Sequence, residues 1–337
     1  MRQHIASKMF RHFIPAVAFC VAALAGMGCA ASAQGSLEPD TVNVDGRGRT
    51  YQLYTPASMP ASRPVPLVLV FHGGFGSGAD AAQHIGMNAV ADRAGFVAAY
   101  PDALDKHWND GRESTAEGAD DIGFVTALIE RIRSKRNIDP RRIYATGLSN
   151  GGYFTLRLAC ELTDVFAAVA PVMSTFPVPL HNRCRPSRPL PLLLIGGTAD
   201  PLVPWNGGEL TRVRDLGGKS GTVISVPNTI EFWRKHNGCA ATARNTTLPD
   251  RSPDDGTRVM QTQYGSCKGD AEVVLLTVEG GGHAWPGSPE RRRIKRMVGR
   301  TSQDINASEM VWEFFSRHPG ATPPADGSAR TTPSGSR

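Results

Sequence analysis

Short apolar runs alternate with helical patterns along most of this chain of 337 residues, and this alternation limits the fold more than any other feature. Strands buried on both faces are typically continuous apolar runs, and such runs span Val65–Phe71, Phe96–Tyr100, Ile143–Thr146, Phe166–Val172, Leu190–Ile195 and Val273–Val278. Helical patterns span Ala79–Ala94, Ile122–Arg133, Tyr153–Leu162, Ile230–His236 and Ala307–Arg317. We therefore predict an α/β fold with a mostly parallel central sheet and helices on both faces.

A glycine-rich turn, Gly147-Leu148-Ser149-Asn150-Gly151, lies between the strand at Ile143–Thr146 and the helix that starts at Tyr153. A serine hydroxyl is a weak nucleophile unless a base removes its proton and the chain presents it openly. A tight strand-to-helix turn exposes the serine and directs the first N–H groups of the helix at the reacting centre. We therefore predict that Ser149 is a nucleophile; the alternative is that it only caps the helix.

Polar or glycine-rich segments directly follow four of the predicted strands, and they contain His72-Gly73-Gly74, Ser149, Asp200 and His283. In parallel sheets the carboxyl ends of the strands lie at one edge, where reactive groups gather. The chain order serine, aspartate, histidine is that of the α/β-hydrolases. We predict that Ser149 attacks an acyl carbonyl, that His283 takes the serine proton, and that Asp200 orients the imidazole.

Two backbone N–H groups are expected to bind the oxyanion that forms during such a reaction, one from Asn150 and one from Gly74. Asp200 is followed by Pro201 and could instead only begin a turn. Asp102 also follows a predicted strand, but it precedes Ser149 in the chain and is the weaker candidate for the acid.

Three further residues, Trp285, His72 and Tyr153, are candidates for contact with the substrate. Trp285 could form an aromatic wall or simply belong to the core. His72 could instead shape its loop by hydrogen bonding. The sequence has neither a CxxC pair nor clustered histidines, which are the usual signals of a metal site. We therefore expect no metal or cofactor.

The first 33 residues have the features of a signal peptide. A basic start is followed by the apolar segment Phe13–Ala25 and by Ala31-Ser32-Ala33, which favours cleavage before Gln34. The apolar segment is short for a membrane span, so we expect a secreted protein, periplasmic or extracellular, with no membrane partner after cleavage. Cys29 raises a lipoprotein alternative, which the preceding Met27-Gly28 disfavours.

Four cysteines remain after the predicted cleavage, and an even number in an exported protein indicates two disulfides. Of the three possible connectivities we favour Cys160–Cys184 and Cys239–Cys267, because each closes a short local loop. The alternative is that some of these cysteines stay reduced and buried.

Charge and composition indicate which partners to expect and where the domain begins and ends. The formal charge of +6 falls to +3 when the three basic residues of the leader are removed, so we expect no nucleic acid as partner. The basic cluster in residues 291–296 is expected to be a solvated loop. Residues 34–317 suit a single catalytic domain, with a polar excursion at Asn245–Gly265, and residues 318–337 read as a disordered tail rich in Pro, Gly, Ser and Thr.

The segments FHGG, DDIGFV, RRIYATGLSNGG, GGTADPLVPW and GGGHAWPG together resemble the secreted esterase/poly(3-hydroxybutyrate) depolymerase family. That family includes feruloyl and acetylxylan esterases with the α/β-hydrolase fold. The resemblance covers about Thr50 to Arg317, and it implies that the nucleophile, acid and base are Ser149, Asp200 and His283. It also leads us to expect a disulfide at Cys239 and Cys267.

The chain departs from the family at one loop, since many relatives carry cysteines after the tryptophan that matches Trp108 and here none follows up to Asp120. The resemblance implies a serine esterase acting on hydroxyalkanoate oligomers or other soluble esters, because the tail is too short for a domain that adsorbs to solid polyester. Feruloyl or acetylxylan esters of plant cell walls are the alternative substrates. A serine peptidase, and a non-catalytic protein that binds an ester or a sugar, are the more remote alternatives.

Overall fold

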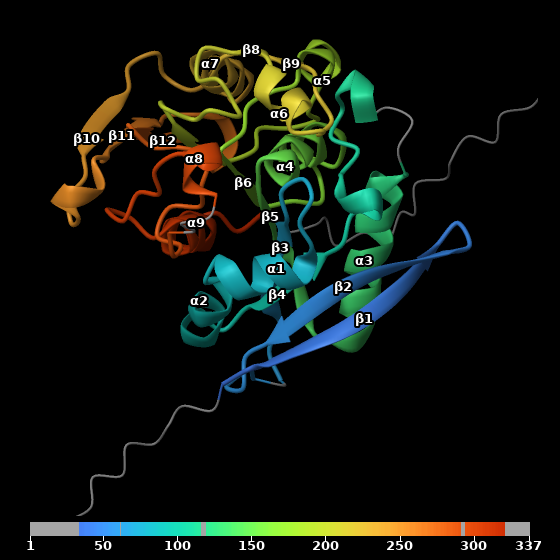
Figure 1. Cartoon of the computed structure of the whole chain (residues 1–337). Coiled ribbons are helices and arrows are strands. Elements are labelled where there is room, and N and C mark those ends of the chain that lie inside the picture. The colour runs from blue at the N-terminus through green and yellow to red at the C-terminus, as the bar shows by residue number, and fades with distance from the viewer. Residues whose placement is uncertain (1–33, 61, 116–118, 291–293, 321–337) are drawn as a thin grey trace, which may run out of the picture. The chain divides into compact units, whose positions relative to one another are not determined.

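The computed structural model of this protein describes residues 34–60, 62–115, 119–290 and 294–320 (Figure 1). The predicted signal peptide, with Cys29, lies outside the described residues. So do residues 291–293 of the basic cluster and residues 321–337 of the predicted tail. From Gln34 onward the described chain forms one compact unit.

A ten-stranded mixed sheet is the centre of the described fold. In spatial order its strands are β1 (Ser36–Val44), β2 (Arg47–Thr55), β4 (Val97–Pro101), β3 (Val65–Phe71), β5 (Ile138–Leu148), β6 (Ala168–Val172), β7 (Leu192–Gly197), β12 (Val273–Glu279), β11 (Arg258–Tyr264) and β10 (Arg244–Thr247). The central strands from β4 to β12 are parallel, whereas the outer pairs at both ends are antiparallel. The predicted parallel sheet is therefore confirmed for the centre only.

The antiparallel strands at both ends of the sheet lie in stretches where the sequence analysis predicts no strand. β1 and β2 form a hairpin through Asp45 and Gly46, whose φ angles of 49° and 76° are those of a tight hairpin turn. β1 is mostly exposed, and β10 and β11 lie almost entirely within the polar excursion predicted at Asn245–Gly265. An antiparallel edge can face water on one side, so its strands need not be apolar runs.

Helices cover both faces of the sheet, as predicted. They are α1 (Gly78–His84), α2 (Met87–Ala94), α3 (Asp121–Lys135), α4 (Asn150–Glu161), α5 (Val178–Arg183), α6 (Thr211–Asp215), α7 (Val226–His236), α8 (Lys295–Val298) and α9 (Ala307–Ser316). The helix predicted at Ala79–Ala94 is divided into α1 and α2 by Gly86, which has a φ of 77°. A small ribbon of β8 (Gly208–Glu209) and β9 (Thr222–Val223) flanks α6.

Alternate side chains of the central strands enter two separate cores. In β3, Leu67, Leu69 and Phe71 join the core that contains residues of α3, α4 and α7. Val68 and Val70 point to the opposite face, where the core contains residues of α1, α2 and α9. Two-sided burial explains why these strands are continuous apolar runs in the sequence.

Two disulfides join the cysteine pairs favoured from the sequence. Cys160 at the end of α4 is bonded to Cys184 after α5, and Cys239 after α7 is bonded to Cys267 before β12.

The predicted tail begins too early, because His318 still bonds to Glu272 (2.8 Å) and Gly320 donates to the carbonyl of Arg141 (2.7 Å).

Candidate active site

Ser149 lies in a sharp turn between β5 and α4. Its φ of 58° and ψ of −118° are strained for a residue with a side chain. Glycine is needed on both sides, because a Cβ added to Gly151 would lie 2.3 Å from the carbonyl oxygen of Phe71, and one added to Gly147 would lie 2.5 Å from that of Gly151. The close approach of β3, β5 and α4 thus requires the glycines of the motif and presents the serine as predicted from it.

Asp200 and His283 are brought together at the carboxyl ends of β7 and β12. Asp200 Oδ2 lies 2.7 Å from His283 Nδ1, and both side chains are buried. The other carboxylate oxygen accepts the backbone N–H groups of Leu202 and Val203, each at 2.8 Å. A carboxylate held in this way fixes the imidazole so that Nδ1 donates to Asp200 and Nε2 is left as the acceptor.

Backbone contacts between neighbouring loops hold the histidine and the aspartate in place. Ala199 N donates to Gly281 O at 3.0 Å, and a Cβ on Gly197 would lie 2.5 Å from that same oxygen. His283 N donates to Val298 O at 2.5 Å, which fastens the histidine loop to the end of α8. The glycines after β7 and β12 therefore permit the two loops to touch.

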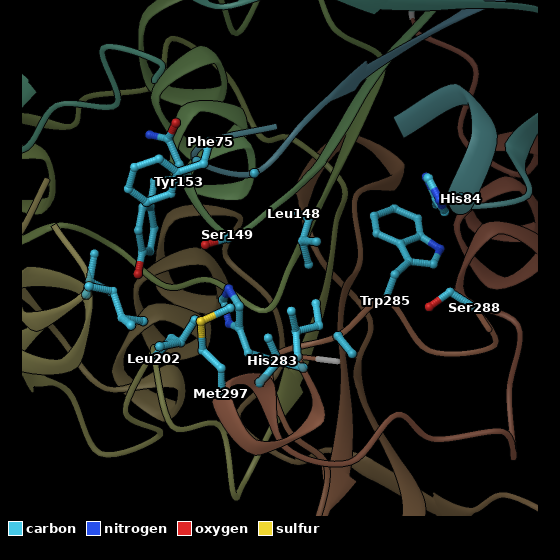
Figure 2. A pocket seen from close by; sticks show the side chains of 18 of the residues that line it. Phe75, His84, Leu148, Ser149, Tyr153, Leu202, His283, Trp285, Ser288 and Met297 are labelled. Carbon is cyan, nitrogen blue, oxygen red and sulfur yellow. The ribbon is translucent and has the colours of Figure 1, made fainter. Parts of the chain in front are cut away.

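A cavity of about 440 Å³ contains both Ser149 and His283 in its wall. Figure 2 shows these two side chains near its middle, with Tyr153, Phe75 and Leu202 on one side and Trp285 on the other. Most of the wall is apolar, formed by Phe75, Ile85, Leu148, Leu202, Val213, Leu216, Ala284, Trp285, Pro289, Ile294, Met297 and Val298. Space on both sides of the serine suits an ester, whose acyl and alcohol parts extend in two directions from the reacting carbon.

Several other predicted residues line the same cavity. Gly74 and Asn150, the candidates for the oxyanion contacts, are both in its wall. Trp285 combines the two roles weighed from the sequence, because it lines the cavity, belongs to a core cluster and donates from Nε1 to Ser308 Oγ at 3.1 Å. Tyr153 also lines the cavity and is 2% exposed.

His72 does not line the cavity, which corrects its assignment as a substrate-binding residue. Its Nδ1 bonds to the carbonyl of Gly73 (2.7 Å), and its Nε2 accepts the N–H of Ala103 (3.0 Å). Burial lowers the pKa of His72 below its ordinary value, so the ring stays neutral near pH 7. Both ring nitrogens are occupied by backbone groups, and His72 shapes the loop that carries Gly74.

The Asp102 carboxylate bonds to Gly78 and Thr50 rather than to His283. Its Oδ1 accepts the N–H of Gly78 at 2.7 Å, and its Oδ2 accepts the hydroxyl of Thr50 at 2.8 Å. These bonds connect β2, the end of β4 and the start of α1. The carboxylate that bonds to His283 is that of Asp200, which agrees with the choice of acid made from chain order.

A buried polar network beneath Asn150 was missed by the sequence analysis. The Asn150 side chain accepts the N–H of Trp108 at 2.8 Å and donates to Trp108 O at 3.1 Å and to Asp110 Oδ2 at 2.6 Å. Asp110 is fully buried and also receives Arg112 Nη2 at 2.6 Å and the hydroxyl of Thr115 at 2.9 Å. The loop after Trp108 thus clamps the first turn of α4, where a candidate oxyanion contact lies.

The described residues contain no group of three or more His, Cys, Asp or Glu side chains placed to hold a metal ion. Among the same residues, no helix combines the length and the apolar character needed to cross a membrane.

Comparison with known proteins relates the chain to a set of esterases. A family model described as esterase PHB depolymerase matches residues 49–176. NocK of Nocardia uniformis subsp. tsuyamanensis, described as an esterase, is 34% identical over 283 residues, which cover 81% of this chain and 81% of NocK.

Feruloyl esterase B of Piromyces equi is 34% identical over 237 residues, which cover 68% of this chain but only 41% of that longer protein. Among solved structures, the acetyl xylan esterase from Aspergillus awamori has a TM-score of 0.52 and covers 83% of this chain and 99% of its own. At 14% sequence identity this last similarity concerns the α/β-hydrolase fold alone.

Proposed function

The chain belongs to the esterase/PHB depolymerase family and is a carboxylic ester hydrolase of the serine type, and from that premise we propose that Ser149, His283 and Asp200 form its catalytic triad. The observation that carries this proposal is the 2.7 Å bond between Asp200 and His283, together with the cavity whose wall contains both His283 and the strained Ser149. The chemistry of such a set of groups is acyl transfer through a covalent intermediate.

The reaction follows from the roles of these groups. Ser149 Oγ attacks the ester carbonyl carbon while His283 Nε2 takes the hydroxyl proton, and Asp200 stabilises the imidazolium that forms. The C–O bond to the alcohol then breaks, and the alcohol leaves with the proton from His283. Water, deprotonated by His283, next attacks the acyl-enzyme, which releases the acid and restores the serine.

The negative charge that develops on the carbonyl oxygen needs hydrogen-bond donors. We assign this role to the backbone N–H groups of Asn150 and Gly74, which both lie in the cavity wall. The clamp on the Asn150 side chain and the hydrogen bonds of His72 hold the two segments rigidly, so these donors are placed before the charge forms.

We propose soluble esters as substrates, with hydroxyalkanoate oligomers first because the matching family model bears the PHB depolymerase name. The largely apolar cavity suits a short aliphatic ester chain. Feruloyl or acetylxylan esters are the second candidate, favoured by the similarity to a feruloyl esterase. A protein that only binds an ester or a sugar is disfavoured by the intact Asp200–His283 pair.

We also propose that the protein is secreted. The two disulfides favour an oxidising compartment, and the first 33 residues have the composition of a signal peptide. Mass spectrometry of the mature protein tests this proposal. We expect Gln34 at the N-terminus, whereas a lipoprotein would begin with an acylated Cys29.

Replacement of the nucleophile tests the proposed mechanism. Hydrolysis of p-nitrophenyl butyrate should fall by about three orders of magnitude in Ser149→Ala, because only the oxyanion contacts and substrate binding remain. The matched control is Ser134→Ala, which removes an exposed hydroxyl from α3. Equal rates for wild type and Ser149→Ala would remove the triad. A panel of hydroxybutyrate oligomers, methyl ferulate and acetylated xylan then separates the two substrate classes.

A further inference from the structure

The hydroxyl of Tyr153 is a buried polar group that the mechanism does not use. Tyr153 is one helical turn after Ser149, and its backbone N–H donates to Ser149 O at 2.9 Å. Its side chain is 2% exposed and lines the cavity, yet its hydroxyl has no hydrogen-bond partner among the described residues. A buried hydroxyl without a partner has lost its bonds to water and gained none in return, so it calls for an explanation.

The surroundings of Tyr153 fix its ring and offer the hydroxyl little else to bond. The ring packs in a small apolar cluster with Val203, Leu210 and Val223. The guanidinium of Arg112 lies over its face, 5.1 Å from the ring centre. Arg112 is itself held by the buried Asp110. The phenol is therefore a preorganised group rather than a side chain free to seek a partner.

Tyr153 lies close to the place where a bound ester would react. Figure 2 shows Tyr153 beside Ser149, on the side of the cavity that also carries Phe75 and Leu202 and away from Trp285. Burial raises the pKa of Tyr153 far above its ordinary value, so the hydroxyl remains protonated and can donate. A fixed donor in a largely apolar cavity selects for an acceptor at one place on the substrate.

We propose that the Tyr153 hydroxyl is a specificity determinant that donates a hydrogen bond to a second oxygen of the substrate, a hydroxyl or ether-type oxygen a few bonds from the scissile carbonyl. The enzyme then favours esters with such an oxygen over plain alkyl esters of similar size. This inference rests on the proposed function, since it places the reacting carbonyl at Ser149. It adds a requirement that neither the triad nor the apolar wall imposes.

Matched pairs of esters test the inference in Tyr153→Phe. In the first pair, p-nitrophenyl 3-hydroxybutyrate and p-nitrophenyl butyrate, the second oxygen is in the acyl part. In the second pair, 2-methoxyethyl butyrate and butyl butyrate, it is in the alcohol part. For one of these pairs, the ratio of kcat/KM for the oxygen-bearing ester to that for the plain ester should fall about tenfold, as expected from the loss of one hydrogen bond.

The ratio distinguishes a change in specificity from a change in packing, because a change in packing alone would lower kcat/KM for both esters of a pair by the same factor. Tyr264→Phe, which removes a half-buried phenol from β11 outside the cavity, is the matched control and should leave both ratios unchanged. Unchanged ratios for both pairs in Tyr153→Phe would overturn the inference.

Two further outcomes are distinguishable. Should Tyr153→Phe fail to fold, the wild-type enzyme decides, since equal kcat/KM within both pairs refutes the inference and a preference for an oxygen-bearing ester supports it. Full activity of Ser149→Ala toward all four esters would instead remove the proposed function on which the inference depends.

Discussion

The buried carboxylate of Asp110 offers a sharp test of how the loop after Trp108 supports the site. The substitution Asp110→Ala removes the acceptor of Arg112 Nη2 (2.6 Å) and Asn150 Nδ2 (2.6 Å). The Arg112 side chain is only 3% exposed, so it would be left as a largely buried positive charge without its carboxylate partner. Asn150 would keep its two bonds to Trp108 and lose the third.

The magnitude follows from this geometry. Removal of one partner from a buried, hydrogen-bonded ion pair typically costs about 3–5 kcal/mol, because the remaining charge stays desolvated. We expect the free energy of unfolding of Asp110→Ala to fall by about that amount. The double variant Asp110→Ala/Arg112→Met removes the stranded charge together with its partner and should recover a large part of the loss.

Equilibrium unfolding in urea, followed by circular dichroism with the disulfides intact, measures these differences. Glu130→Ala is the matched control, because it removes a carboxylate from the exposed ion pair with Arg133 (2.9 Å) and should change stability very little. An Asp110→Ala variant as stable as Glu130→Ala, or a double variant no more stable than Asp110→Ala, would refute the reasoning.

Two further changes test the turn at Ser149 and the contacts that Glu272 makes near the end of the described residues. Gly151→Ala should reduce ester hydrolysis at least a hundredfold, because the new Cβ would lie 2.3 Å from Phe71 O and displace the turn; normal kcat/KM in a folded variant would contradict this. Burial tends to raise the pKa of Glu272, but the hydrogen bonds from His318 and Arg317 outweigh it and lower the pKa from 4.5 to about 2. The ionised Glu272 carboxylate therefore contributes fully to the stability of the folded state above pH 4.5, and this contribution is lost as the pH falls toward 2. Between pH 5 and pH 2 the urea midpoint of Glu272→Gln should therefore decrease less than that of the wild type.

The central part of the fold could be predicted because its strands are buried on both faces. Val65–Phe71 is a strand with the predicted bounds, and the other central strands differ from their predictions mainly at their ends. The antiparallel ends could not be found in the same way, since β1 and β10 are largely exposed and carry no apolar run. The first hairpin does carry a sequence signal in its turn, Asp45-Gly46, which the sequence analysis did not use.

The candidate site could be predicted where a residue stands directly after a central strand. Asp200 and His283 were proposed on that ground, and the structure places them in contact. His72 follows the same rule but is turned into its own loop, where Gly73 and Ala103 occupy its ring nitrogens. A position at a strand end thus brings a residue to the right edge of the sheet without deciding which way its side chain points.

The amino-acid sequence alone determined the buried strands and the glycine-bounded turn at Ser149, because these depend on local periodicity and on backbone freedom. It also determined the chain order of the candidate catalytic residues. Only the tertiary structure decided that Asp110 and Arg112 support the turn at Asn150 and that the hydroxyl of Tyr153 has no hydrogen-bond partner among the described residues. Such contacts join segments about 40 residues apart, such as Asp110 and Asn150, and they exist only once the chain has packed around the sheet.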